Sequence, residues 1–440
     1  MYNRKSGSKT NGGHTNLKRR AFLQSMAVPT AMLAGRRTEA AASSGYVVGV
    51  GHSSKSYGAA RTAIAASGQF PSAAIAGQTV IIKPNLVIAS PSTSGITTDP
   101  EVVRAIVDLA LAAGAARILI AEGSCVQPAP FGPCGYGFFQ TYDPQGRITL
   151  VDLCKQADRL VSVGKPGGMV YQQMWLPDPV TGPDAIFISA AKLKTHNCVG
   201  ATLSMKCLVG MAPPSIYTVT NEWPRQDLHY RGIAESIIDL NCARPVDFAV
   251  IDGIWGMEGE GPTSGKAIQA DLVFAGLNPT AVDLVALQAI QIPQLTVPYL
   301  YYAGALGMGP TSVNGVTVKG DAYTPVPFTP APTPPIVWHP AAVPNQLTRG
   351  QSATISYQMP GACYTRLEIV QDSDATPGVT LVKTLHGWTA RPAGVESMVW
   401  NGTADNGSPV APGLYLARVQ AQYTLSGPIN YASTMVTVKA

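Results

Sequence analysis

Ionisable side chains follow five apolar runs in the amino-terminal part of this 440-residue chain, in which only 13% of residues are charged. Each run has the composition of a buried strand. In chain order, the groups after these strands are His52, Lys83 with Asn85, Glu122, Lys192 with Lys194 and His196, and Asp252. Because ligands of open α/β sheets bind beyond the carboxyl ends of the strands, we expect these groups to share one site. The alternative is that each group belongs to an ordinary polar loop.

The segment KLKTH, residues 192–196, places three of these groups at alternate positions. In an extended chain Lys192, Lys194 and His196 would point to the same side. Lys206 follows nearby, and several cations on one edge suit a carboxylate, a phosphate or another anion. The alternative is a solvated loop with snorkelling lysines. We predict that a small anionic substrate is bound by Lys83, Asn85, Lys192 and Lys206. The predicted catalytic groups are His196, Lys194, Glu122 and Asp252.

The glycine-rich segment DGIWGMEGEGPTSGK, residues 252–266, resembles a phosphate-binding loop only superficially. The spacing of its glycines before Lys266 does not match G-x-x-x-x-G-K-[ST], and Ala267 stands where that motif needs a hydroxyl. Its acids also lack the spacing of an EF-hand. We predict that His52, Glu258 and Glu260 bind a divalent metal. The carboxylates could instead do acid–base work or simply neutralise the lysines.

Other common catalytic motifs are missing from the sequence. It contains no H-E-x-x-H and no G-x-G-x-x-G, and Ser124 lacks the G-x-S-x-G of a serine hydrolase. None of the seven cysteines forms a C-x-x-C, which argues against an iron–sulfur cluster. The pairs Cys125/Cys134 and Cys198/Cys207 are each nine residues apart, and the sequence leaves disulfides and buried free thiols open.

Residues 45–320 must position these groups, and they alternate strand and helix signals. The clearest unit is TTDPEVVRAIVDLALAAGAARILIAEG, in which Asp99 caps a helix, Pro100 begins it and Gly114 ends it before a buried strand. Further helices are predicted over residues 228–241 and 279–290. This alternation predicts an α/β fold with a mainly parallel sheet flanked by helices.

A different pattern follows residue 320. Residues 321–340 form a proline-rich linker, which we expect to be stiff and extended. Residues 341–440 contain six short alternating runs separated by turn signals, a pattern that predicts an all-β immunoglobulin-like sandwich.

Residues 1–42 have the features of a signal peptide. Arg19 and Arg20 precede Phe22, a modest apolar stretch follows, and small residues at 40–42 suit a cleavage site. This pattern predicts export by the twin-arginine (Tat) translocon, with an ordinary secretory leader or an uncleaved anchor as alternatives. Tat exports folded proteins, so a metal or other cofactor loaded beforehand is expected, although its identity is unknown.

The net charge argues against a nucleic-acid partner. Residues 1–42 carry eight basic residues and one acid, so their removal changes the formal charge from +5 to −2. A chain this close to neutrality has no basic footprint for nucleic acid. We expect a periplasmic or extracellular protein associated with the cell envelope.

Several segments together resemble the domain of unknown function 362 family. They are VIIKPNLV, TTDPEVVRAIVDLALAAGAARILIAEGS, AAKLKTHNCVGATLSMKCLVGM, DFAVIDGIWGMEGEGPTSG and NPTAVDLVAL, and they occur in order across residues 46–310. The resemblance implies that the glycine-rich loop is a site loop, but it implies no settled reaction. Many members carry a ferredoxin-type module, whose cysteine run this sequence lacks.

The carboxyl-terminal segment VWNGTADNGSPVAPGLYLARVQA resembles the immunoglobulin-like domain of flagellar hook-assembly (FlgD-type) proteins. The resemblance implies surface attachment or spacing.

Two hypotheses follow for the whole chain. One is an exported enzyme that acts on a small anionic substrate with a metal or cofactor loaded before export. The other is a non-catalytic anion- or metal-binding protein displayed at the envelope through its immunoglobulin-like domain.

Overall fold

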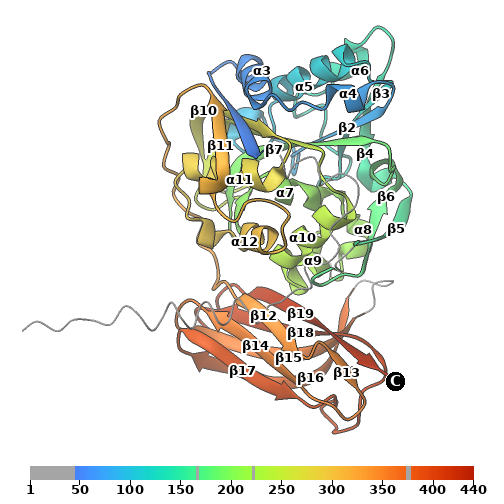
Figure 1. The fold of residues 1–440 in the computed structure, drawn as a ribbon, viewed down its shortest axis with the longest axis vertical. Coiled ribbons are helices and arrows are strands. Elements are labelled where there is room, and N and C mark those ends of the chain that lie inside the picture. Colours follow the sequence, from blue (N-terminus) through green and yellow to red (C-terminus); the bar gives the residue numbers. More distant parts are fainter. Residues whose placement is uncertain (1–44, 165–167, 221–222, 373–377) are drawn as a thin grey trace, which may run out of the picture. The chain divides into compact units, whose positions relative to one another are not determined.

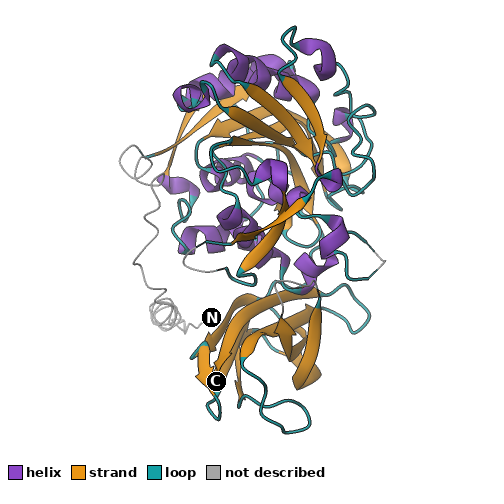
Figure 2. Ribbon diagram, turned by 90° about the vertical axis from the view of Figure 1, so that its right-hand side faces the viewer, coloured by secondary structure: helices purple, strands orange, loops and turns teal. Residues whose placement is uncertain are grey.

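The computed structural model describes residues 45–164, 168–220, 223–372 and 378–440. These residues form an α/β part built on one large sheet, followed by smaller sheets near the carboxyl terminus (Figure 1, Figure 2). The α/β class and the strand-rich carboxyl-terminal region are therefore confirmed. The predicted signal peptide lies outside the described residues.

The large sheet has the strand order β11-β1-β10-β9-β7-β2-β3-β4, with β8 paired to β7. Its strands are β1 (Tyr46–His52), β2 (Thr79–Pro84), β3 (Arg117–Glu122), β4 (Ile148–Asp152), β7 (Ile186–His196), β8 (Gly200–Thr202), β9 (Phe248–Glu258), β10 (Lys266–Gly276) and β11 (Val316–Gly320). The central pairs β7–β2, β2–β3 and β7–β9 are parallel. Strand β10 instead pairs antiparallel with β1 and β9, so the sheet is mixed. The sequence does not distinguish this reversed strand, because a strand buried on both faces is a continuous apolar run in either direction.

Helices cover both faces of this sheet (Figure 1). On one face lie α3 (Ser56–Ser67) and α5 (Pro100–Ala112), and their core includes Ile82, Ile106 and Ile120. On the other face lie α7 (Ser204–Cys207), α10 (Ile233–Ala243), α11 (Pro279–Ala289) and α12 (Pro298–Ala305). The core beneath them includes Phe187 and Val285. Both faces of the central strands are therefore buried in apolar cores, and polar side chains can cluster only at the strand ends.

Helix α5 begins and ends where the sequence predicts. The Asp99 side chain accepts a hydrogen bond of 2.9 Å from the N–H of Glu101, and Pro100 occupies the first turn. Gly114 has a φ of 82°, the left-handed conformation that commonly terminates a helix. These local signals position the end of β2 and the start of β3 on either side of the helix.

The helix predicted over residues 228–241 is divided in two. Helix α9 (Gln226–Tyr230) ends before Gly232, whose φ of 116° is incompatible with a continuous helix, and α10 follows. Arg231 and Asp227 form a buried ion pair of 2.8 Å that holds the end of α9. The break separates α9, which carries His229, from α10.

Shorter elements complete the α/β part. They are α4 (Ser72–Ile75), α6 (Phe139–Tyr142), α8 (Pro214–Tyr217), the hairpin of β5 (Asp158–Ser162) and β6 (Gln173–Pro177), and the 3₁₀ turns η1 (Ser92–Ser94), η2 (Leu153–Lys155), η3 (Asp178–Val180), η4 (Leu208–Met211), η5 (Gln294–Thr296) and η6 (Val313–Gly315). No helix in the described part of the chain is both long enough and apolar enough to cross a membrane.

The carboxyl-terminal strands form a three-stranded sheet in the order β12-β14-β17 and a five-stranded sheet in the order β13-β19-β18-β15-β16. Their bounds are β12 (Trp338–Val343), β13 (Gln346–Thr348), β14 (Ala353–Met359), β15 (Cys363–Asp372), β16 (Val379–Arg391), β17 (Gly394–Trp400), β18 (Gly413–Gln422) and β19 (Asn430–Lys439). The six predicted runs coincide with β14 to β19. Their inward residues, including Ile355, Tyr357, Trp400 and Val419, are fully buried in one core.

The proline-rich segment before these sheets is extended, and it is bound to the α/β part. Val326 and Phe328 donate backbone hydrogen bonds of 2.8 and 2.9 Å to the carbonyls of Ala289 and Ile290. The Phe328 ring is only 4% exposed. This segment therefore adds to the core of the α/β part.

Candidate functional site

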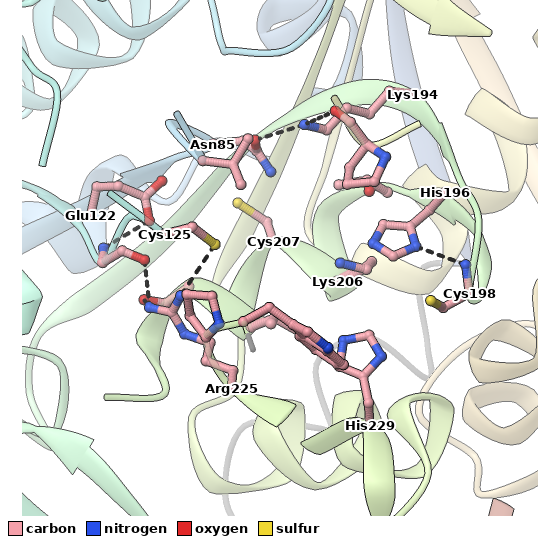
Figure 3. Close-up of a pocket in the computed structure, with 18 of the residues that line it drawn as sticks. Asn85, Glu122, Cys125, Lys194, His196, Cys198, Lys206, Cys207, Arg225 and His229 are labelled. Atoms are coloured by element: carbon pink, nitrogen blue, oxygen red, sulfur yellow. Dashed lines mark hydrogen bonds between the residues drawn. The ribbon is translucent and has the colours of Figure 1, made fainter. Parts of the chain in front are cut away.

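A cavity of about 360 Å³ lies at the carboxyl ends of β2, β3 and β7. Six of the predicted site residues line it, namely Lys83, Asn85, Glu122, Lys194, His196 and Lys206. Figure 3 shows five of them, Asn85, Glu122, Lys194, His196 and Lys206, together with Arg225 and His229 on the opposite side. We name this space the lysine cavity. The strand-end argument therefore located residues that the fold brings together.

The Lys83 ammonium forms an ion pair of 2.7 Å with Oε1 of Glu122, and both side chains are almost fully buried. The carboxylate also accepts hydrogen bonds from the N–H groups of Leu86 and Gly123, at 2.6 and 2.8 Å. Burial acts to lower the pKa of Lys83, but the neighbouring Cys207 and Glu122 raise it more, so its pKa lies above the ordinary value. This pair is neutral as a whole and contributes no net charge to the cavity.

Lys194 is saturated with acceptors. Its ammonium donates to Asn85 Oδ1 at 3.1 Å, to the carbonyl of Ile96 at 2.7 Å and to the carbonyl of Pro262 at 3.2 Å. Burial and the neighbouring cations of Lys206 and Lys192 lower its pKa to about 7. A neutral Lys194 would have to direct its lone pair at one of three oxygens, so the geometry favours the charged form. Asn85 is oriented by this contact, and its Nδ2 has no partner among the described residues.

His196 is held as a neutral donor. Its Nδ1 accepts a hydrogen bond of 3.1 Å from the N–H of Cys198, so the ring proton is on Nε2. Burial and the charge of Lys206 hold the pKa of His196 well below its ordinary range. The imidazole therefore offers Nε2–H as a fixed hydrogen-bond donor.

Lys206 differs from the other lysines of the cavity. It lies in α7 and is 9% exposed, yet no hydrogen bond or ion pair involving it is found among the described residues. Burial is the main cause that lowers its pKa to about 8. Its ammonium thus has no acceptor among the described residues, unlike those of Lys83 and Lys194.

The cavity is also lined by residues that the sequence did not predict. They are Cys125, Cys198, Cys207, Trp223, Arg225 and His229. Residues 223–229 do not follow directly after a strand, so an argument from strand ends cannot find them. The only local signal is a tryptophan, an arginine and a histidine in one short stretch of a charge-poor chain.

Arg225 is a buried cation without a carboxylate. Its Nε donates to the carbonyl of Ala212 at 2.6 Å, and Nη2 donates to the carbonyls of Gly123 and Gly210 at 2.6 and 3.3 Å. Nη1 contacts Cys125 Sγ at 3.7 Å. A guanidinium has five N–H donors, so one on Nη1 is unused by the described residues. The φ of Arg225 is 64°, a strained conformation for a residue with a side chain.

His229 completes this wall from α9. Its ring packs edge-on against Trp223, with centroids 4.5 Å apart. Burial, followed by the charge of Lys206, lowers the pKa of His229 to about 3, so the ring is neutral near pH 7. Glu122, paired with Lys83, is the one carboxylate among the described residues that line the cavity. The charges of Lys194, Lys206 and Arg225 are therefore uncompensated.

Lys192 and Asp252 lie outside the lysine cavity. They form an ion pair of 2.8 Å in which both side chains are fully buried. Burial raises the pKa of Asp252, and the charge of Lys192 opposes this shift. Asp252 also accepts the N–H of Asp99 at 2.7 Å, so the pair joins β7 and β9 to the start of α5. The extra residues of the β7–β9 register shift lie in β9, so Lys192 is opposite Asp252 whereas Lys194 is opposite Met257 and has no carboxylate across the pair.

The predicted metal ligands are also separate from the cavity. His52 and Glu260 are exposed, and Glu258 accepts a hydrogen bond of 2.8 Å from the N–H of Thr329. Within residues 45–440 as described, no group of three or more His, Cys, Asp or Glu side chains could hold a metal ion. The donor set therefore does not fit the metal site predicted at His52, Glu258 and Glu260.

The glycine-rich loop contributes backbone to the cavity, and its carboxylates point elsewhere. It connects β9 and β10 as a hairpin, and the carbonyl of Pro262 accepts from Lys194. A Cβ on Gly261 would lie 2.0 Å from the carbonyl oxygen of Thr195, so only glycine permits this close approach to β7. The loop is a site loop that shapes one wall.

All seven cysteines are free thiols. The alternative of disulfides between Cys125 and Cys134 or between Cys198 and Cys207 is therefore wrong for this structure. Burial raises the pKa of Cys198 and of Cys207, so these thiols are protonated near neutral pH. Cys125 is exposed at the mouth of the cavity.

The segment that carries the cavity is similar to a known family. Residues 80–288 match the family described as Domain of unknown function (DUF362), and every residue lining the cavity falls within these bounds. The predicted resemblance is confirmed for this segment. A thylakoid-associated protein of Synechocystis sp. is 24% identical over 238 residues, which cover 54% of this chain and 71% of that protein.

Two solved FlgD structures are also similar to part of the chain. FlgD of P. aeruginosa is 19% identical over 20% of this chain and 62% of that one, with a TM-score of 0.16. FlgD of Xanthomonas campestris is 24% identical over 24% of this chain and 69% of that one, with a TM-score of 0.17. The match thus spans less than two thirds of the P. aeruginosa chain. Likeness at these TM-scores says nothing about activity.

Proposed function

We propose that the protein is an exported enzyme that binds a small anionic substrate in the lysine cavity. The observation that carries this proposal is the uncompensated charge of three buried cations. Lys194, Lys206 and Arg225 line one cavity, and the only carboxylate on its described wall is already paired with Lys83. Burying unpaired charge costs several kcal/mol, roughly, unless a partner binds. An anion is the partner that would offset this cost.

The proposed substrate contacts follow from the unused donors. Three donors are unpaired among the described residues and can bind an anion. They are Asn85 Nδ2, His196 Nε2 and one N–H of Arg225 Nη1. Lys194 contributes charge from a fixed position, because three oxygens hold its ammonium. Neutral donors and fixed cations in a desolvated site stabilise negative charge more strongly than they would in water.

No step of the proposal passes through a metal, because the described side chains offer no three-donor cluster. Elemental analysis and an absorption spectrum of the mature protein test the expectation of a cofactor loaded before export. If the protein contains a stoichiometric metal, the proposal would include that metal as a cofactor. Metal-free protein would leave anion binding to the lysine cavity alone.

The export part of the proposal depends on the sequence of residues 1–42, with its arginine pair Arg19–Arg20. Mass spectrometry of the protein from the periplasmic fraction would give its amino terminus. Cleavage near residues 40–42 that is lost in an Arg19→Lys/Arg20→Lys variant would support Tat export. Cleavage that persists in this variant would favour an ordinary secretory leader.

Calorimetric titration with sulfate, phosphate and lactate tests the anion site directly. We expect Lys206→Met to weaken binding by about tenfold or more, as loss of one charged contact costs about 1.5 to 3 kcal/mol. Lys266→Met is the matched control, since Lys266 is 77% exposed and far more solvated. Absence of binding to the unmodified protein would refute the proposal. Binding without turnover in a broad substrate screen would instead favour the non-catalytic, envelope-associated binding protein.

A further inference from the structure

Lys206 is distinguished within the lysine cavity by its lack of acceptors. Lys83 is paired with Glu122, and Lys194 donates to three oxygens. Lys206 is nine-tenths buried and lines the same cavity, but it has no hydrogen-bond or ion-pair partner in the part of the chain that the structure describes. A structural lysine at such a depth is normally paired. Because Lys206 lines the cavity and lacks a protein partner, we infer that it contacts a ligand there.

The groups that face Lys206 do not supply a counter-charge. Lys194 and His196 approach from β7, and Arg225 and His229 approach from the opposite wall (Figure 3). Cys125, Cys198 and Cys207 are the remaining titratable neighbours. The set therefore consists of cations, neutral imidazoles and thiols, without a carboxylate that could fix Lys206 as an ammonium ion.

Such surroundings increase the neutral fraction of the Lys206 amine, which is charged at pH 7 and about half neutral near pH 8. Burial is the largest cause that lowers the pKa of Lys206 to about 8; the three cysteines of the cavity oppose this shift, and Arg225 acts with burial. Lysines at the ordinary pKa of about 10.4 are less than about 1% neutral at pH 8. Desolvation beside another cation is a recognised way to activate a lysine as a nucleophile. The Nζ of Lys194, in contrast, is surrounded by three oxygen acceptors, so its lone pair could not point at a substrate.

We propose that Lys206 is the nucleophilic amine of the lysine cavity and condenses with a small oxo acid to form an imine. This inference rests on the proposed function and adds to it the chemical class of the substrate. The Nζ lone pair attacks the carbonyl carbon, and the C=O π pair moves to oxygen to give a carbinolamine. The two hydrogens of the amine and the carbonyl oxygen then leave as water, and a C=N bond forms. No further reactant is required.

The unused donors of the cavity match the other end of such a substrate. Arg225, Asn85 and His196 line the same cavity as Lys206, and their unused N–H groups can bind the carboxylate. An oxo acid places its carboxylate and its carbonyl one bond apart. Its carboxylate would therefore neutralise the uncompensated charge, and its carbonyl would react with the free amine, in a cavity of about 360 Å³.

Reductive trapping tests this inference on the full chain. The protein is incubated with pyruvate and cyanoborohydride at about pH 8, and the reduced adduct is located by peptide mass spectrometry. We expect at least about tenfold more adduct at Lys206 than at the exposed Lys266, because the lowered pKa makes more neutral amine available. Lys206→Arg should abolish the adduct, whereas Lys266→Arg should not affect it.

Two ligands separate the inference from the proposed function. Methyl pyruvate has the same ketone without the charge, and it should label Lys206 less than pyruvate does. Lactate has the charge without the ketone, and it should protect Lys206 from pyruvate. If lactate binds and pyruvate gives no preferential adduct at Lys206, the imine inference is overturned while the anion site stands. If none of lactate, pyruvate, sulfate and phosphate binds, the proposed function fails together with the inference.

Discussion

The Nζ of Lys83 lies 2.7 Å from Oε1 of Glu122, and neither side chain is more than 4% exposed. The two residues lie at the ends of the neighbouring parallel strands β2 and β3. The pair neutralises the only carboxylate among the described residues of the lysine cavity. The positive character of the cavity thus depends on Lys194, Lys206 and Arg225.

This pair should be strongly coupled. Glu122→Gln leaves Lys83 as a buried charge without its counter-ion, and we expect a loss of about 3 to 5 kcal/mol of unfolding free energy. The double variant Lys83→Met/Glu122→Gln should lose less than the sum of the two single variants. Urea denaturation of the four proteins gives the coupling energy. Additive losses would show that the pair does not act as a unit.

The Lys192–Asp252 pair should act on stability. Asp252→Asn removes the partner of a fully buried lysine, and we expect a loss of about 3 to 5 kcal/mol. Asp178→Asn is the matched control, because the Arg159–Asp178 pair has a similar N–O distance of 2.7 Å at the surface. It should cost no more than about 1 kcal/mol. Equal losses in the two variants, measured by urea denaturation, would contradict the burial argument.

Lys206 should destabilise the unliganded protein in a pH-dependent way. Its pKa of about 8 lies below the ordinary value of 10.5, so the folded protein binds fewer protons between these pH values. Its penalty is therefore full below pH 8 and disappears as the pH rises to 10.5. We expect Lys206→Met to be more stable than the unmodified protein by roughly 3 kcal/mol at pH 7 and by little at pH 10.5. Thermal or urea unfolding at several pH values measures this difference. A constant difference would contradict the lowered pKa.

Gly210 should be required next to the buried pair. A Cβ at this position would lie 2.6 Å from both Glu122 Oε1 and Lys83 Nζ. We expect Gly210→Ala to cost about 1 to 3 kcal/mol and to weaken anion binding, because the pair must move into the cavity. Gly137→Ala is the control, since nothing lies within 4 Å of its Cβ position. Unchanged stability and binding in Gly210→Ala would show that the pair can shift without consequence.

Cys125 should report occupancy of the cavity. It is the exposed thiol of the cavity wall, whereas Cys134 and Cys207 are buried. We expect iodoacetamide to modify Cys125 first and a bound anion to slow this reaction, with Cys134 and Cys207 as internal controls. Peptide mass spectrometry gives the rates. If saturating sulfate or lactate leaves the rate at Cys125 unchanged, the anion binds elsewhere.

Local signals in the sequence determined much of the framework. Asp99, Pro100 and Gly114 specify the bounds of α5, because capping and the left-handed terminator depend on neighbours within a few residues. The apolar runs likewise predicted the central strands. Since parallel strands bring their carboxyl ends to one edge, the sequence also predicted that Lys83, Glu122 and His196 meet.

Only the tertiary structure decided which charges are used for stability and which are free for a ligand. Glu122 and Asp252 are both carboxylates near strand ends, and their partners lie 39 and 60 residues away. A register shift in β9 places Asp252 opposite Lys192 and Met257 opposite Lys194, and alternation along β7 cannot reveal it. Arg225 directly precedes α9 and His229 lies within it, and both line the cavity. Such pairings depend on how distant segments approach in space, whereas propensity and periodicity describe only nearby residues.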